Sequence, residues 1–436
     1  MSRSMLCAAV LSLFSLPALA QEDPAEDPAA DDQPWQGDGM SWGGVPALNY
    51  NSDDGFGYGV LGSLYFYDTK TAPYDWSTTF LIFKTTKNIH THRVDFDFVD
   101  FLDMPLRVNT RVEFFLTRSA NYCGLNPANF CDDVGLDDGS VSPRAASAAG
   151  ALGLVDDPDS GDDEFDQFVR RYYKLRYTNP NALLNARYKV NELPHKFEIM
   201  GGWWGGMLIP GDFDADAPFE GSLYDEDFPG GEEGFYSTFQ AGLMLDNRDN
   251  EPAPTSGYWI EGTGRGGFFT GYDGGYYGFN TTLRGYLPLT KNKRLVLASR
   301  EIVDGIFGNA PVPELGRAGG SQILSFFGGQ YTGRGVRSTG LLGRARFFAQ
   351  NELRWTAVSF KLGGANVDLT LLGFADLGYV AVDWSDIGGD AARGFVGEGA
   401  GLRVAVNKNF IVRVDAGFSG LEENSMGLYI NVNNLY

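Results

Sequence analysis

The sequence predicts an all-β protein, a transmembrane antiparallel β-barrel of about 16 strands. Aromatic residues make up 14% of the 436 residues and glycine occurs 58 times, although the mean hydropathy is slightly negative. Beyond the N-terminus no apolar run reaches the roughly 18 residues that a membrane-spanning helix needs. From residue 44 onward, segments of alternating apolar and polar residues are separated by turns or loops, which is the pattern of strands with one face in lipid.

The N-terminus has the pattern of a secretory signal peptide. An apolar stretch after Arg3 ends in Ala18-Leu19-Ala20, a small-residue cleavage site, so we expect cleavage after Ala20. The localisation expected for the mature chain is the bacterial outer membrane. The expected domains are the signal peptide (1–20), an acidic, proline-rich disordered periplasmic segment (21–43) and the barrel (44–436).

The formal net charge of −22 is concentrated in the 21–43 segment and in two polar loops, 132–166 and 212–233. Such loops lie outside a membrane, and their negative charge argues against nucleic acid as a partner, because a phosphate-binding surface needs positive charge. We expect the outer surface to meet outer-membrane lipid and lipopolysaccharide, with divalent cations bridging the negative groups.

Two cysteines belong to the expected mature chain. Cys123 and Cys131 lie in a short polar loop in an oxidising compartment, where a disulfide is the natural state. We predict no cofactor and no metal site. Residues Asp212–Asp216 are similar to the start of a calcium loop, but Ala217 and Leu223 replace the Gly and Glu that such a loop needs.

Residues 107–116 and 410–418 show the strand alternation most clearly. In the first segment the odd positions are Arg, Asn, Arg and Glu, while most even positions are apolar. Arginine and carboxylates on one strand face indicate a wet lumen, with the apolar face toward lipid. The chain ends in another alternating segment, Leu428–Tyr436, which we expect to be the final strand.

Four local motifs follow one another along the chain. They are a hairpin motif with Asp246, Arg248, Asp249 and Gly257, a loop motif with Gly328, Gly329, Arg334, Gly335 and Val336, a strand motif with Phe374, Asp376 and Gly378, and a second strand motif with Gly397, Gly399 and Gly401. In this order they resemble the outer-membrane assembly-factor superfamily that includes BamA, TamA and the two-partner secretion transporters, also called the bacterial surface antigen family. The resemblance covers most of residues 44–436.

The resemblance implies that Gly328–Val336 is the tip of a long outer loop that folds into the lumen. In the family the loop arginine meets a carboxylate of the barrel wall, so Arg334 would pair with Asp376. A guanidinium can hold a carboxylate by two parallel charge-assisted hydrogen bonds, which would lock the loop inside. Gly333 and Val336 depart from the branched and aromatic residues of the family and predict a weaker hydrophobic anchor for the tip.

Two functions compete at this point. The first is outer-membrane protein assembly or translocation, in which a loose wall or a moving inward loop lets a substrate pass. The second is a passive diffusion pore, which requires that Gly328–Val336 leaves the lumen open. Only residues 21–43 lie between the expected cleavage site and the first predicted strand, too few for the periplasmic POTRA repeats of the family. A separate periplasmic or outer-membrane protein partner could take their place.

No enzyme active site is predicted. The sequence has no Gly-x-Ser-x-Gly motif, and none of its three histidines, His90, His92 and His195, has a convincing catalytic partner. A membrane-bound lipolytic enzyme is the third alternative, and it would require a nucleophile and a base within hydrogen-bond reach at the barrel rim. His90 and His92 share one strand face with Val94 and are expected at the interfacial end of a lipid-facing strand.

Overall fold

A computed structural model describes most of the chain from residue 39 onward. The described ranges are 39–51, 55–68, 70–71, 74–125, 143–154, 164–190, 196–211, 222–229, 231–322, 324–325, 328–336, 342–362, 365–406, 410–420, 425–432 and 434–436. The expected signal peptide, Cys131, His195 and the calcium-like segment Asp212–Asp216 lie outside these ranges.

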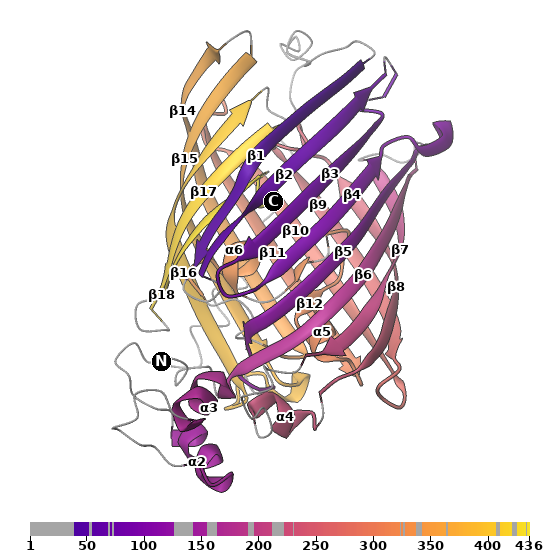
Figure 1. Cartoon of the computed structure of the whole chain (residues 1–436). Helices are drawn as coiled ribbons and strands as arrows, with labels where there is room; N and C mark the ends of the chain where they lie inside the picture. Colours follow the sequence, from indigo (N-terminus) through magenta and orange to yellow (C-terminus); the bar gives the residue numbers. More distant parts are fainter. Residues whose placement is uncertain are drawn as a thin grey trace. The chain divides into compact units, whose positions relative to one another are not determined.

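The described residues form one closed barrel of sixteen antiparallel strands, which confirms the expected fold class (Figure 1). Strands that follow one another in the chain lie side by side, and β12 and β13 form a separate two-stranded sheet between β11 and β14. The strands are β1 (Gly39–Asn51), β2 (Gly55–Tyr67), β3 (Trp76–Thr85), β4 (His90–Phe98), β5 (Leu106–Asn121), β6 (Lys174–Lys189), β7 (Phe197–Pro210), β8 (Gly234–Asp246), β9 (Gly257–Phe269), β10 (Gly275–Pro288), β11 (Leu295–Gly308), β12 (Arg317–Ala318), β13 (Leu324–Ser325), β14 (Ala345–Leu362), β15 (Ala365–Ala381), β16 (Ala392–Val406), β17 (Phe410–Ser419) and β18 (Ser425–Val432).

The first strand begins at Gly39 rather than at the expected residue 44. Met40 and Trp42 have exposed fractions of 53% and 75%, so the alternation of exposed apolar residues already runs through this stretch. Residues 39–43 therefore belong to the barrel and not to the acidic segment before it.

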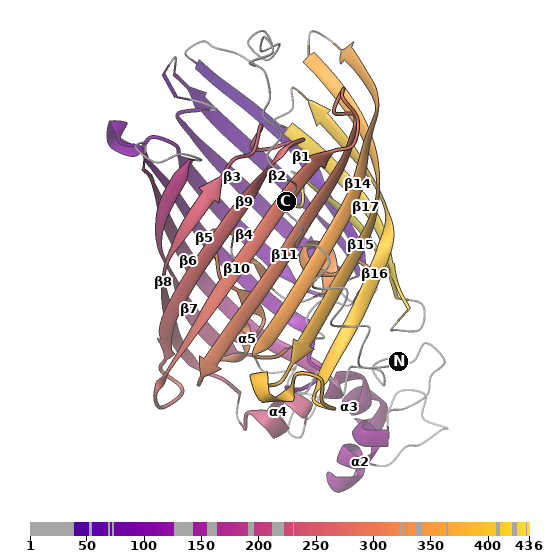
Figure 2. The ribbon, with the colours of Figure 1, turned by 180° about the vertical axis from the view of Figure 1, so that it is seen from behind.

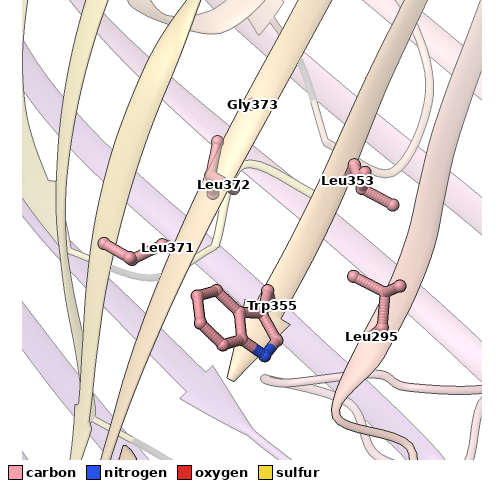
Figure 3. A pocket seen from close by; sticks show the side chains of 6 residues that line it. All are labelled: Leu295, Leu353, Trp355, Leu371, Leu372 and Gly373. Carbon is pink, nitrogen blue, oxygen red and sulfur yellow. The ribbon is translucent and has the colours of Figure 1, made fainter. Parts of the chain in front are cut away.

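The two faces of each strand meet different surroundings. Outward side chains such as Val112, Phe239 and Trp355 are apolar and exposed, as a lipid-facing band requires. A shallow apolar groove of about 330 Å³ lies on this outer wall, across β11, β14 and β15, and Figure 3 shows the side chains that line it. The inward faces of β14, β15 and β17 instead carry charged residues with no exposed surface, including Glu352, Asp376 and Asp415.

The two ends of the barrel differ in their connections. β1 starts and β18 ends at the same end, and the longest connections, 122–173, 211–233 and 309–344, all lie at the other end. Outer-membrane barrels place short turns in the periplasm and long loops outside, so the long-loop end is extracellular. In the part of the chain that is described, no helix is long and apolar enough to cross a membrane.

The largest apolar cluster lies at the extracellular end. The helices of the described residues are α2 (Pro143–Ala151), α3 (Glu164–Tyr172), α4 (Leu223–Asp227), α5 (Val312–Leu315), α6 (Gly329–Thr332) and the short 3-10 turns η2 (Phe101–Asp103) and η4 (Trp384–Asp386). Phe168 and Tyr172 of α3 belong to one cluster with Tyr224 of α4, Leu315 of α5 and Tyr236 of β8. Figure 2 shows the barrel from behind, with the wall formed by β8 to β11 facing the viewer.

The seam between β1 and β18 is the shortest strand pairing of the barrel wall among the described residues. Only Tyr50–Leu428 and Asn51–Gly427 pair there, although both strands continue toward the periplasmic end. Pro46 has no N–H to donate, and its partner on β2 is Val60. The carbonyl groups of Phe56 and Phe66 accept hydrogen bonds from the β3 side, so the even positions of β2, Val60 included, face β3 and leave Pro46 facing away from β2. The edge of β1 that lacks a donor therefore faces β18, which helps to explain why the seam ladder stops.

Candidate functional site

The candidate site lies in the lumen, at the tip of the connection between β11 and β14. This connection carries α5, β12, β13 and α6, and Arg334 follows α6 after one residue, Gly333. Throughout the tip, Gly328–Val336, the residues are buried or partly buried, and the Arg334 side chain has no exposed surface. The tip makes polar contacts with β11, β14, β15, β17 and β18, so it lies against one continuous arc of the barrel wall that ends at the β1–β18 seam.

Arg334 contacts carboxylates on three strands. Its backbone N and its Nε donate to Oδ2 of Asp376 at 3.0 and 2.9 Å, and its Nη2 donates to Oδ1 at 2.9 Å. Its Nη1 lies 2.7 Å from Oε1 of Glu352 and 3.4 Å from Oδ2 of Asp415. The structure thus brings Arg334 and Asp376 together with two side-chain hydrogen bonds, and it adds two carboxylates that the motif comparison did not name.

Two further arginines complete this ion cluster. Nη2 of Arg354 lies 2.7 Å from Oε2 of Glu352, and Nη1 of Arg403 lies 2.7 Å from Oδ1 of Asp415. A charge removed from water costs several kcal/mol unless it is well paired. Because each carboxylate of the cluster has at least one guanidinium partner, the loop arginine and the wall stabilise one another.

Two motif residues make room for the loop backbone. A Cβ atom at Gly397 would lie 2.1 Å from the carbonyl oxygen of Arg334, so only glycine fits where the loop crosses β16. Gly335 has a φ of +90°, a conformation that favours glycine, and its backbone passes close to Phe418. The ring of Phe374 completes the site, because the guanidinium carbon of Arg334 lies 3.5 Å from its centroid.

The tip has a hydrophobic anchor in the barrel wall. Val336 is 1% exposed and packs in a buried cluster with Ile302, Phe348, Val380 and Phe395. A Cβ at Gly333 would lie 2.6 Å from the Phe395 ring, so the small residue lets this wall phenylalanine reach the tip. The wall supplies the aromatic group that the loop lacks.

The tip also contacts β18, the strand of the seam. The backbone N–H of Gly335 donates to the Tyr429 hydroxyl at 3.1 Å. Nδ2 of Asn431 donates to Oε1 of Gln330 at 2.9 Å and to the Tyr331 hydroxyl at 3.0 Å. The motifs did not point to these residues, although the alternation of β18 places Tyr429 and Asn431 on its inward face.

The last residues do not continue the final strand as expected. β18 ends at Val432, and Leu435 and Tyr436 are buried inside the barrel. The Tyr436 hydroxyl donates to the carbonyl oxygen of Gln350 at 3.0 Å, and its main-chain oxygen accepts a hydrogen bond from Arg354 at 3.1 Å. Arg354 and Arg300 also lie over the Tyr436 ring, so cation–π contacts and polar contacts hold the tail in the lumen.

Asp304 of β11 anchors the first part of the same connection. It accepts a hydrogen bond from the backbone N–H of Gly319 at 3.0 Å, pairs with Nη1 of Arg265 at 2.9 Å and contacts Arg346. All three charged side chains are buried. Sequence reasoning missed this second anchor because it depends on which strands lie next to the loop.

The hairpin motif lies away from the Arg334 cluster, at the periplasmic end. Nε of Arg248 lies 2.9 Å from Oδ1 of Asp246, and Asp249 accepts a hydrogen bond from the backbone N–H of Thr255 at 2.9 Å. Gly257 begins β9 with a φ of +102°. These residues shape the 247–256 connection.

This connection is tied to β5 by Glu251, which lies 2.7 Å from Nη1 of Arg107. Burial alone would raise the pKa of Glu251, but the charges of Arg107, Arg187 and Arg248 lower this pKa to about 2. From the opposite side of the barrel, Asn434 donates to the carbonyl oxygen of Pro252 at 2.9 Å. The 247–256 connection and the chain end therefore meet across the periplasmic mouth.

The remaining glycines of the motifs border this site. Gly328 and Gly329 precede the arginine in the tip, and a Cβ at Gly401 of β16 would lie 2.1 Å from Oδ1 of Asp415. Gly399 and Gly378 leave room in the wall for the rings of Phe374 and Phe395. Cys123 is buried and disulfide-bonded, while its predicted partner Cys131 is not among the described residues. Within the described ranges, no group of three or more His, Cys, Asp or Glu side chains could hold a metal ion.

A family model described as the Omp85 superfamily domain matches residues 167–424, more than half of the chain. The chain belongs to the Omp85 superfamily. The match includes the hairpin, loop and strand motifs, and this family agrees with the resemblance inferred from them. No protein of curated function matches the sequence.

Solved structures with the same fold include other barrels of this kind. The Omp85 barrel described here is similar to CdiB from Escherichia coli, with 11% identity, a TM-score of 0.53, and coverage of 92% of this chain and 63% of that one. BamA from Haemophilus ducreyi lacking POTRA domains 1–3 has 14% identity and a TM-score of 0.47, over 91% of this chain and 70% of that one. At these identities the likeness to CdiB shows the fold alone.

Proposed function

We propose that this Omp85 barrel acts in the assembly or translocation of proteins at the outer membrane, with the loop tip and the β1–β18 seam as its moving parts. One observation carries the proposal. The tip Gly328–Val336 is bound on one side to the wall through Asp376 and on the other side to β18 through Tyr429 and Asn431. Movement of the tip would therefore change the contacts that hold β18 at the seam.

The seam is suited to open because little holds it. Two described residue pairs join β1 and β18, whereas the other neighbouring strands, such as β1 and β2 or β14 and β15, are paired along most of their lengths. A strand edge with free N–H and C=O groups is a template for pairing with another chain. An incoming strand of a client protein could add to such an edge by backbone hydrogen bonding.

The passive pore is the second candidate, and the position of the tip distinguishes the two. A pore requires a water-filled lumen. Here Arg334, Arg300, Leu435 and Tyr436 are buried inside the barrel, which supports the assembly or translocation proposal over the pore.

Single-channel conductance of the refolded barrel in a planar bilayer tests the proposal. The native chain should give small, flickering conductance, and both Arg334→Ala and Asp376→Ala should raise it because the tip is released. Arg344→Ala is the matched control, since Arg344 pairs with Asp383 only at a partly exposed site. Large, steady conductance that neither variant changes would show that the tip does not plug the lumen, and it would favour the pore.

A protein partner in the periplasm or outer membrane is part of the proposal, because an assembly barrel acts on other chains. Cross-linking of intact envelopes followed by purification of the barrel should recover such a protein. Recovery of none, under conditions that trap a known outer-membrane complex, would contradict this part of the proposal.

A further inference from the structure

Four basic side chains gather on the outer surface of the barrel, at the extracellular ends of β3, β4 and β5. They are Lys84, His90, His92 and Arg118, named here the rim cluster. Lys84 and His90 are direct cross-strand partners, and the rings of His90 and His92 are 5.7 Å apart. Lys84, His92 and Arg118 all interact electrostatically with His90. The three strands lie side by side in the wall (Figure 1).

The strand alternation places this cluster on the lipid-facing side. On β3, Lys84 continues the outward row of Phe80 and Ile82, and on β5, Arg118 continues the row of Val112 and Phe114; these four apolar side chains are exposed. On β4, His92 pairs with Ile82 on one side and with Phe114 on the other. The apolar band therefore changes to positive charge at the level of the outer-leaflet headgroups.

The described part of the chain does not neutralise this charge on the same face. The outward positions of β3, β4 and β5 carry no Asp or Glu among the described residues. The nearby Asp95 is on the opposite face of β4, where it lies 2.6 Å from Nε of Arg111 and 3.2 Å from Nε of Arg93.

Two costs of this arrangement point to an external anion. Like charges directly opposite each other in a sheet are destabilising, and Lys84 faces His90 whenever the imidazole is protonated. In addition, Nδ1 of His92 is buried and has no hydrogen-bond partner. An anionic group from outside the chain would offset the repulsion.

We propose that the rim cluster binds the phosphate groups of lipid A, the membrane anchor of lipopolysaccharide, in the outer leaflet. An ammonium, two imidazoles and a guanidinium donate charge-assisted hydrogen bonds to phosphate oxygens, and a guanidinium does so in a bidentate way. The acyl chains of the same lipid would lie over the exposed row of Phe80, Ile82 and Val94. This inference depends on the position of the barrel in the outer membrane and is independent of the assembly role.

Binding of purified lipid A to the refolded full-length barrel in detergent, followed by native mass spectrometry, tests the inference. The double variant Lys84→Gln/Arg118→Gln should bind bisphosphorylated lipid A about 30-fold more weakly, from about 1 kcal/mol per basic residue and tenfold per 1.4 kcal/mol. Lipid A without phosphates should bind weakly to both proteins.

The matched control is Arg294→Gln/Lys361→Gln, which removes two exposed basic residues from the periplasmic end. It should leave lipid A binding within about twofold of the native value, well under the tenfold that 1.4 kcal/mol represents. An equal loss in the control would reduce the effect to net charge and overturn the site. Undiminished binding by the rim variant would also overturn it, as would equal binding of phosphatidylglycerol with the same dependence on Lys84 and Arg118.

Discussion

The β14–β15 wall and the β1–β18 seam are opposite extremes of the same barrel. The wall ladder runs from Ala345–Ala381 to Leu362–Ala365 with one bulge, whereas the described seam ladder has two pairs. The wall also holds Arg334 through Asp376 and Glu352, while the seam strand meets the loop tip through neutral hydrogen bonds. The tip is therefore held to the β14–β15 wall by buried ion pairs, whereas its contacts with β18 are neutral hydrogen bonds to a strand that is itself weakly paired with β1.

The largest expected effect is the loss of the wall anchor. Arg334→Ala leaves Asp376 buried without its guanidinium, and breaking a buried pair in this way costs about 3–5 kcal/mol. Denaturant unfolding, monitored by heat-modifiable gel mobility, should show a free energy of unfolding that is lower by this amount. Arg344→Ala, at the base of the same loop, should cost less than about 1 kcal/mol because its ion pair is partly exposed.

Equal effects of Arg334→Ala and Arg344→Ala would contradict the role of the buried Arg334–Asp376 pair as the firm anchor of the tip. A double variant, Arg334→Met/Asp376→Leu, sharpens it further. Replacing both partners of a buried pair by apolar residues is often close to neutral, so the double variant should be more stable than Arg334→Ala.

Paired cysteines measure the seam directly. Tyr50→Cys/Leu428→Cys should form a disulfide readily, because paired residues of antiparallel strands lie within disulfide reach. Leu48→Cys/Ile430→Cys continues the same register and should form little disulfide, since the ladder stops before this pair. Similar yields for both pairs, measured by non-reducing gel shift, would show a seam that is zipped along its length.

Glu232 offers a smaller effect at the extracellular start of the same loop. This buried carboxylate accepts hydrogen bonds from the Val312 N–H at 3.1 Å, from the Tyr224 hydroxyl at 3.2 Å and from Tyr272, without a guanidinium partner. Burial raises the pKa of Glu232 to about 7. Its contribution to stability is therefore present below about pH 4.3, the usual pKa of Glu, and is lost as the pH rises through about 7.

Protease cleavage of the extracellular loops should accordingly be faster at pH 8 than at pH 5.5. The side chain of the Glu232→Gln variant cannot ionise, so this variant should be cleaved at nearly the same rate at pH 8 and at pH 5.5. A native chain whose cleavage is independent of pH would count against this junction as a pH-sensitive part of the loop.

The smallest expected effect concerns the periplasmic tie. Glu251→Gln should change the free energy of unfolding by less than about 1 kcal/mol, because the carboxylate of this pair is partly exposed. Since the pKa of Glu251 is lowered to about 2, the tie is present above about pH 4.3 and is lost as the pH falls through about 2. Protease should therefore cleave the 247–256 connection of the native chain faster at pH 3 than at pH 6. The Glu251→Gln variant should not show this difference.

The sequence could predict those features that repeat locally. Alternation indicated the inward faces of β5 and β17, and the resemblance of the loop and strand motifs to the family predicted the pair of Arg334 and Asp376. Two contacts of the tip could not be predicted, namely that of Arg334 with Asp415 and that of Gln330 with Asn431. Each joins the loop to a strand that is far from it in the sequence. Tyr436 was misplaced because alternation continues through residues 434–436, whereas their position depends on Arg300 and Arg354 across the lumen.

The most direct test of the account is the disulfide yield of Leu48→Cys/Ile430→Cys with and without Arg334→Ala. If the tip holds β18 inward through Tyr429 and Asn431, releasing the tip should let β18 pair further along β1, and the yield should rise severalfold. Tyr50→Cys/Leu428→Cys should change little in the same background. An unchanged Leu48–Ile430 yield in the Arg334→Ala barrel would show that tip and seam are uncoupled, and it would contradict the proposed mechanism.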